Sequence, residues 1–259
     1  MKKLATLIPT AVVAGLALAF AFSVAAQPQQ VTAKVTRING SARYSTDAAN
    51  WMPLKVGMEL GSGTVIQTAA GSIVDLVLGD LDVVAQPTPK VGDTLSYQPM
   101  AEQDALRLYG DTVLALDKMT ALKTGMDEVR ETQLDLRAGK LFGMVKKLSP
   151  ASKYEVKLPN GVAGIRGTIY SITAQGIVSV LEGTVVLAYV GADGTVVTQV
   201  INAGYQFNVG TGQLIPLPAI EQRELASAAG EIVAVPGLIS EPTVITVDQN
   251  QYFISPVSD

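Results

Sequence analysis

The chain has 259 residues, a formal net charge of −4, 48% hydrophobic residues, and neither histidine nor cysteine. Mild acidity makes it a poor candidate for non-specific nucleic-acid binding, so we predict no nucleic-acid partner. The missing residue types exclude disulfides, Ser-His-Asp and Cys-His catalysis, and most zinc, copper and haem ligation. We therefore expect no bound metal, no cofactor and no enzymatic activity.

The N-terminal segment has the pattern of a secretory signal. Met1-Lys2-Lys3 precedes an apolar run from Leu4 to Ala26, with small residues at Val24 and Ala26. This predicts a signal helix over residues 1–26, cleavage after Ala26, and a periplasmic or secreted protein. The alternative is an uncleaved anchor, since the run is near the length of a membrane span. Contact with the membrane is expected only through this segment.

Beyond residue 27, apolar and polar residues alternate with a period of two in many runs. Examples are Val31–Val35, Tyr154–Leu158 and Val185–Tyr189, with turn pairs such as Asn160-Gly161 and Glu182-Gly183 between the runs. Alternation of this kind predicts half-buried strands, and frequent turns predict an all-β fold. We expect an antiparallel β-sandwich or jelly-roll-like domain, or a β-solenoid-like one.

Two regions depart from this pattern. Residues 80–105 contain Pro87 and Pro89, which disfavour a central strand, so we interpret this region as a loop or hairpin inserted between two core strands. The main β domain is placed at 27–212, followed by a tail at 213–259. The tail is predicted to hold a short helix near 217–230, ending at Gly230, and strand-like pieces at 243–247 and 251–254.

Trp51 is the only tryptophan and the first candidate binding residue. A lone tryptophan before a proline caps one end of a β core in the commoner case. The alternative is a platform for the face of a sugar ring.

A second candidate is a run of lysines in an otherwise acidic chain. Its members are Lys140, Lys146, Lys147, Lys153 and Lys157. Alternation along strands would place some of them on one face. That face is interpreted either as a solvated surface that discourages edge pairing or as a patch for an anionic wall polymer or an acidic partner.

Arg166 is the sharpest single candidate, because it stands alone among small and apolar neighbours in Gly164-Ile165-Arg166-Gly167-Thr168. We expect partial burial and therefore a carboxylate or carbonyl partner that ties strands together. The alternative is that its planar donor fork holds an anionic ligand. The glycines around it are interpreted as turn or close-approach positions.

The acidic residues form no recognisable metal or catalytic motif. Asp80 and Asp82 lack the remainder of a calcium loop. Asp104, together with Glu102, is interpreted as surface charge, as are Asp127 and Glu128. A carboxylate-based hydrolase stays a third hypothesis, since spacing in sequence cannot show whether two carboxylates face each other across a cleft.

Several motifs occur in an order that resembles FecR-type domains. They are the strand entering Asn39-Gly40, the run Trp51–Leu60, Val65–Thr68 with Gly71-Ser72, Gln133–Phe142, Lys157–Ile172 with its Arg166-Gly167-Thr168 signature, and Leu181–Val185. The resemblance spans roughly residues 31–210. It implies an antiparallel β domain outside the cytoplasm.

The best-known members of that family relay occupancy of an outer-membrane TonB-dependent receptor to a cytoplasmic sigma factor. Only Met1-Lys2-Lys3 precedes the apolar run here, so we expect no cytoplasmic segment to hold a sigma factor. The leading hypothesis is a protein-interaction or signalling-relay module with a protein partner in the cell envelope. The alternative is a carbohydrate-binding module for a wall glycan such as peptidoglycan or for an exopolysaccharide.

Overall fold

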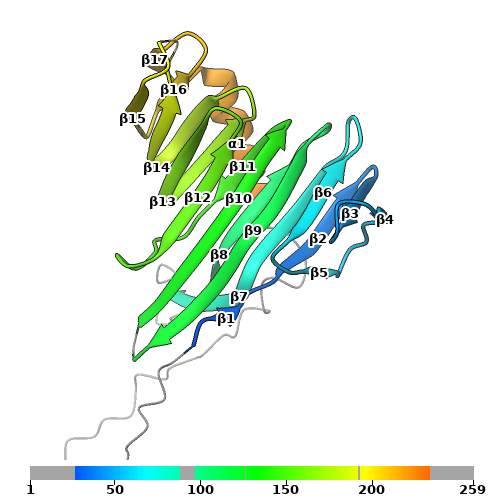
Figure 1. The fold of residues 1–259 in the computed structure, drawn as a ribbon. Helices are drawn as coiled ribbons and strands as arrows, with labels where there is room; N and C mark the ends of the chain where they lie inside the picture. Colours follow the sequence, from blue (N-terminus) through cyan, green and yellow to red (C-terminus); the bar gives the residue numbers. More distant parts are fainter. Residues whose placement is uncertain (1–26, 88–96, 126, 192, 234–259) are drawn as a thin grey trace, which may run out of the picture.

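The computed structural model describes residues 27–87, 97–125, 127–191 and 193–233, with side chains except at 80–103 and Val233. Strands dominate these ranges, and one helix, α1, spans Ala219–Val233 (Figure 1). The strands are β1 (Gln29–Gln30), β2 (Ala33–Asn39), β3 (Ala42–Ser45), β4 (Met52–Pro53), β5 (Glu59–Leu60), β6 (Thr64–Thr68), β7 (Ile73–Pro87), β8 (Tyr97–Leu108), β9 (Val113–Thr124), β10 (Asp127–Ala138), β11 (Lys140–Met144), β12 (Lys153–Leu158), β13 (Gly161–Thr173), β14 (Ile177–Val190), β15 (Val196–Asn202), β16 (Tyr205–Asn208) and β17 (Gln213–Pro216). The predicted all-β fold is confirmed.

The alternation read from the sequence matches burial along the strands. In β12, Tyr154, Val156 and Leu158 are buried, while the residues between them are not. Successive side chains of a strand point to opposite faces of the sheet, so a period of two places one set in the core.

The sheet curls into two layers that share one core. One layer follows the pairings β2–β7–β8–β11, and the other follows β3–β6–β9–β10–β12. The long strands β13 and β14 join the layers, because β13 pairs with β12 through its first half and with β11 through its second half. In Figure 1 the sheet curls so that β7 and β8 lie behind β9 and β10.

Two details differ from the sequence-based expectation. β10 and β12 pair in parallel, from Glu131 opposite Lys153 to Asp135 opposite Lys157, so the sheet is not wholly antiparallel. The pair Glu182-Gly183, expected to be a turn, lies inside β14. Gly183 has a positive φ of 79° there, and the register with β13 shifts beside it, so this glycine forms a β-bulge.

The main core lies between the two layers. Its fully buried residues come from both, including Leu76 of β7, Leu106 of β8, Leu116 of β9, Leu134 of β10 and Tyr170 of β13. Tyr170 is accommodated because Gly143 lies opposite it in β11, and a Cβ at Gly143 would overlap the tyrosine ring. A single contiguous core therefore holds the two layers together.

Helix α1 covers the outer face of the β8–β11–β13 layer. Leu225, Ala228 and Ile232 recur at helical spacing and pack against Ala105 and Phe142, which point away from the main core. The helix begins close to the predicted position, but the predicted stop at Gly230 is wrong. The helix continues to Val233 because burial of Ile232 outweighs the low helix propensity of glycine.

An ion-pair network fastens the end of α1 to the sheet. Arg107 of β8 donates to both carboxylate oxygens of the buried Asp75 at 2.8 and 3.1 Å, and Arg37 of β2 donates to Asp75 at 2.7 Å. Glu231 of α1 accepts from Arg107 at 2.9 Å and from Arg37 at 3.2 Å. Sharing two arginines between two carboxylates compensates the buried charge of Asp75.

The remaining predictions about chain organisation fall partly outside the described ranges. Parts of the predicted 80–105 insertion form the ends of β7 and β8, which pair as a hairpin from Asp82 opposite Glu102 to Pro87 opposite Tyr97, whereas 88–96 are not described. The predicted signal segment 1–26 and the tail pieces 243–247 and 251–254 also lie outside the description. Within the part of the chain that the structure covers, no helix is both long and apolar enough to cross a bilayer.

Candidate functional site

The Arg166-Gly167-Thr168 signature forms a β-bulge in β13. Gly167 has a positive φ of 59°, and the register with β14 shifts after Arg166. The buried hydroxyl of Thr168 accepts from the backbone N–H of Thr184 at 3.3 Å and lies 3.1 Å from the carbonyl oxygens of Arg166 and Thr184. The threonine therefore fixes the bulge, a structural role that the sequence analysis gave to the arginine.

The expected burial of Arg166 is wrong. Its side chain is exposed, and within the described residues no ion pair or side-chain hydrogen bond holds it. The cause is the alternation of side chains along the strand. Ala163 and Ile165 point into the core, so Arg166 points outward. Arg166 thus lies at the surface. The alternative, that its guanidinium holds an anionic ligand, stays a prediction.

The structure does not gather the five lysines into one patch. Lys140 pairs with Glu221 of α1 at 3.0 Å, Lys153 with Glu155 at 3.0 Å, and Lys157 with Asp117 at 2.7 Å.

Lys146 and Lys147 lie together in the segment after β11. They line a hollow of about 220 Å³ that also contains Asp127, Glu128 and Arg130. Burial lowers the pKa of Lys146. Because both acidic and basic side chains line this hollow, it has no uniform positive field.

A buried polar cluster that sequence reasoning missed lies beside this hollow. Asp104 was interpreted as surface charge, but it is 2% exposed and faces inward from β8. Burial raises its pKa to about 6, against the opposing effects of the Lys146 backbone N–H, which donates to it at 2.8 Å, and of Arg130, 4.0 Å away. The two-residue spacing along β8 could have revealed this burial, because Asp104 shares the inward face of the strand with Leu106 and Leu108.

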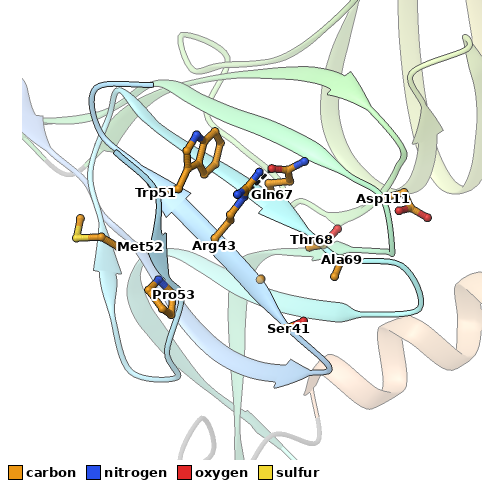
Figure 2. Close-up of a pocket in the computed structure, with 10 residues that line it drawn as sticks. Ser41, Arg43, Trp51, Met52, Pro53, Gln67, Thr68, Ala69 and Asp111 are labelled. Carbon is orange, nitrogen blue, oxygen red and sulfur yellow. Dashed lines mark hydrogen bonds between the residues drawn. The ribbon is translucent and has the colours of Figure 1, made fainter. Parts of the chain in front are cut away.

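Trp51 lies beside a surface hollow formed by β3, β4 and β6 (Figure 2). The hollow has a volume of about 520 Å³. Its lining comprises Ser41, Ala42, Arg43, Trp51, Met52, Pro53, Gln67, Thr68, Ala69 and Asp111. We call it the Trp51 hollow. Trp51 itself is half-buried, so the residue lies at the surface of the β domain and not inside its core.

Arg43 is the central polar group of the Trp51 hollow. The carbon of its guanidinium lies 4.7 Å from the centroid of the Trp51 ring, within the range of a cation–π contact. Its Nε donates to Oε1 of Gln67 at 2.8 Å. Figure 2 shows the guanidinium between Trp51 and Gln67, with Asp111 at the other end of the hollow. The contact of Arg43 with Trp51 could not be predicted from the sequence, because it depends on the pairing of β3 with β4.

A second surface feature lies at the opposite end of the sheet (Figure 1). The second half of β14, strands β15, β16 and β17, and the first turn of α1 expose large apolar side chains. They are Val186, Val190, Val196, Val197, Val200, Tyr205, Leu214, Ile215 and Ile220. The sequence from Gly194 to Ile220 contains no charged residue. We call residues 183–220 the apolar end.

Strand β15 gives the apolar end an open edge. Among the described residues it pairs only with β14, in antiparallel register. The backbone N–H of Gly191 donates to the carbonyl of Thr195, and that of Ala203 donates to the carbonyl of Gly183. In an antiparallel pair, every second residue of a strand directs its N–H and C=O groups toward the neighbouring strand. The N–H and C=O groups of Val196, Thr198 and Val200 therefore point away from β14. One of these groups, the carbonyl of Val200, accepts from the Gln199 side chain at 2.8 Å.

Comparison with known protein families gives a match within the β domain. Residues 98–186 match the family model described as FecR protein. Two crystal structures, each described as "a putative anti-sigma factor" from Parabacteroides distasonis ATCC 8503, also match. The first has a TM-score of 0.37 and 15% identity over 64% of this chain and 65% of that one. The second has a TM-score of 0.34 and 13% identity over 54% and 62%.

The chain therefore spans less than two thirds of either structure's chain. No curated protein sequence matches it. The matched residues include the Arg166–Thr168 signature and the motifs at 133–142 and 181–185, whereas the resemblance drawn at Trp51–Leu60 and Val65–Ser72 falls outside them. Over residues 98–186, the chain is similar to the family described as FecR protein.

Proposed function

We propose that this chain is an exported, non-enzymatic FecR-type module that binds a protein of the cell envelope and takes part in signalling. The match over residues 98–186 supports the regulatory part of this proposal. The signal-like pattern of residues 1–26 supports a periplasmic or secreted location, with the mature chain starting at Gln27.

The observation that carries the protein-binding part is the apolar end. Soluble proteins usually protect a sheet edge with lysine, proline or a covering element. Strand β15 contains neither lysine nor proline, and Val196 is 74% exposed. Val186 lies opposite Val200 and Val190 opposite Val196, so these four valines form one exposed face beside the open edge. Contiguous exposed apolar surface of this kind marks an interaction site.

Strand addition is the binding mode that this geometry favours. An extended segment of the partner would bond to the outward N–H and C=O groups of Val196, Thr198 and Val200. Its apolar side chains would then continue the valine face. Because the apolar end has no charge from Gly194 onward, shape and hydrogen bonding would select the partner.

Capture from crosslinked native envelopes tests this proposal. Tagged mature protein is compared with two variants, Val200→Lys and a matched control, Gln133→Lys on the polar outer face of β10. We expect one stoichiometric partner with the wild type and the control, and its loss with Val200→Lys, because a lysine there places a charge on the valine face. Equal recovery of the partner with all three proteins, or no partner at all, contradicts the proposal.

The alternative function, binding of a wall glycan, is favoured by one observation, the Trp51 hollow. Its volume and its mixture of apolar walls with a few polar groups are typical of small-ligand sites. Co-sedimentation with purified wall material, compared between the wild type and Trp51→Ala, tests this alternative.

A further inference from the structure

We infer that the Trp51 hollow binds a carboxylate-bearing saccharide unit and that Arg43, not Trp51, makes the decisive contact. This inference is independent of the protein-binding proposal, because the hollow and the apolar end lie at different ends of the sheet (Figure 1).

The first observation is how the guanidinium of Arg43 is held. In the ladder of β3, Arg43 lies opposite Pro53 of β4 and Gln67 of β6, so its side chain stands on the outer face between two strands. The guanidinium carbon of Arg43 lies over the Trp51 ring, and the Nε of Arg43 donates to Gln67. The two Nη groups remain as a pair of parallel donors, which these two contacts orient.

The second observation is that neither partner of Arg43 carries a negative charge. Arg37, Arg107, Arg130 and Arg137 each pair with at least one carboxylate at 4.0 Å or less, whereas within the described residues Arg43, like Arg166 and Arg223, has no such partner. A guanidinium that is oriented in advance and left without a counter-ion favours a planar anion, which a carboxylate matches with two parallel hydrogen bonds.

The third observation concerns the rest of the wall. Met52, Pro53 and Ala69 supply apolar contacts. At the far end, Asp111 offers only acceptors when ionised. A ligand that fits both ends carries a carboxylate beside Arg43 and hydroxyl donors toward Asp111. A uronic-acid saccharide has this combination, together with C–H faces for the apolar wall.

This geometry also changes the role expected of the tryptophan. At least one face of the indole carries the Arg43 guanidinium, so that face is a support for the arginine and is not open to a sugar ring. Binding should therefore depend more on the charge of the ligand than on its ring, and it should weaken as salt screens the attraction.

Titration of the mature protein tests the inference. The ligand is cellobiouronic acid, the matched neutral ligand is cellobiose, and both calorimetry and Trp51 fluorescence are read, since Trp51 is the only tryptophan of the chain. We expect the acidic disaccharide to bind about ten- to a hundredfold more tightly than cellobiose, the range for a hydrogen-bonded charge.

Variants separate the site from general effects of charge. Arg43→Gln should abolish the preference for the acid, whereas Arg137→Gln, at an exposed arginine of β10, should keep it. Arg43→Lys keeps the positive charge but lacks the two parallel donors of the guanidinium. It should retain only part of the preference for the acidic disaccharide. Circular dichroism verifies that each variant is folded.

Three results would overturn the inference. One is equal binding of the acidic and neutral disaccharides, and another is an equal loss in Arg43→Gln and Arg137→Gln. The third is displacement of the acidic disaccharide by a short acidic peptide at lower concentration, which would assign the hollow to a peptide.

Discussion

Replacing Asp104 by asparagine should make the protein more stable at neutral pH and remove part of its pH dependence. Asp104 is 2% exposed, and burial raises its pKa from 3.8 to about 6. Asparagine keeps an acceptor for the Lys146 backbone N–H and carries no charge to bury. Arg130 keeps Glu128 as its partner at 2.7 Å.

The sign follows from proton linkage. Between pH 3.8 and about 6 the folded protein holds the proton of Asp104 more tightly than the unfolded chain does. The resulting stabilisation is complete below pH 3.8 and is lost as the pH rises through about 6. A pKa gap from 3.8 to about 6 corresponds to about 3 kcal/mol at most, at 1.36 kcal/mol per pKa unit.

Urea unfolding of the wild type and Asp104→Asn, at intervals from about pH 4 to pH 8, measures this difference. The stability of the variant relative to the wild type should rise with pH by up to about 3 kcal/mol and level off above about pH 6.5. The control is Asp135→Asn on the exposed face of β10. A difference that is constant with pH, or an Asp104→Asn variant that loses stability as pH rises, would refute the reasoning.

Three further substitutions test the packing, and each is measured by urea unfolding. Gly143→Ala should destabilise by about 1–3 kcal/mol because its Cβ overlaps the Tyr170 ring, whereas Gly164→Ala should not, since its Cβ meets only a carbonyl at 3.7 Å. Thr168→Val should cost about 1–3 kcal/mol by leaving the bulge without its hydroxyl, and a cost below about 0.5 kcal/mol would contradict that role. Leu225→Ala should cost about 2–5 kcal/mol, and Ile220→Ala, 65% exposed on the same helix, should be nearly neutral; equal effects would mean that α1 is not packed as described.

The strands were predictable because alternation is a local property. Tyr154, Val156 and Leu158 mark the buried face of β12 without knowledge of its neighbours. The parallel pairing of β10 with β12 was not predictable, because both strands alternate in the same way whichever direction their partner runs. The sequence around Gly183 predicts a turn and a bulge equally well, because a positive φ at glycine serves both.

In the candidate sites too, local features were predictable from the sequence, whereas features that depend on strand pairing were not. Trp51 stood out by its rarity, but its partner Arg43 is set by the pairing of β3 with β4 and β6. Asp104 is buried because it lies two residues before Leu106 on the same face of β8, whereas the charge of an aspartate alone predicts exposure. Arg166 was misjudged for a related reason, since its apolar neighbours are adjacent in sequence yet lie on the other face of β13.

Site-specific photo-crosslinking in cells tests the central claim most directly. A photoreactive phenylalanine analogue is placed at Val200, at Leu214, or at the control position Gln133 of β10, and the adducts are identified. We expect one envelope protein to be crosslinked at Val200 and Leu214 and to be absent at Gln133. Adducts that are equally frequent at all three positions, or found only at Gln133, would contradict a protein-binding role for the apolar end.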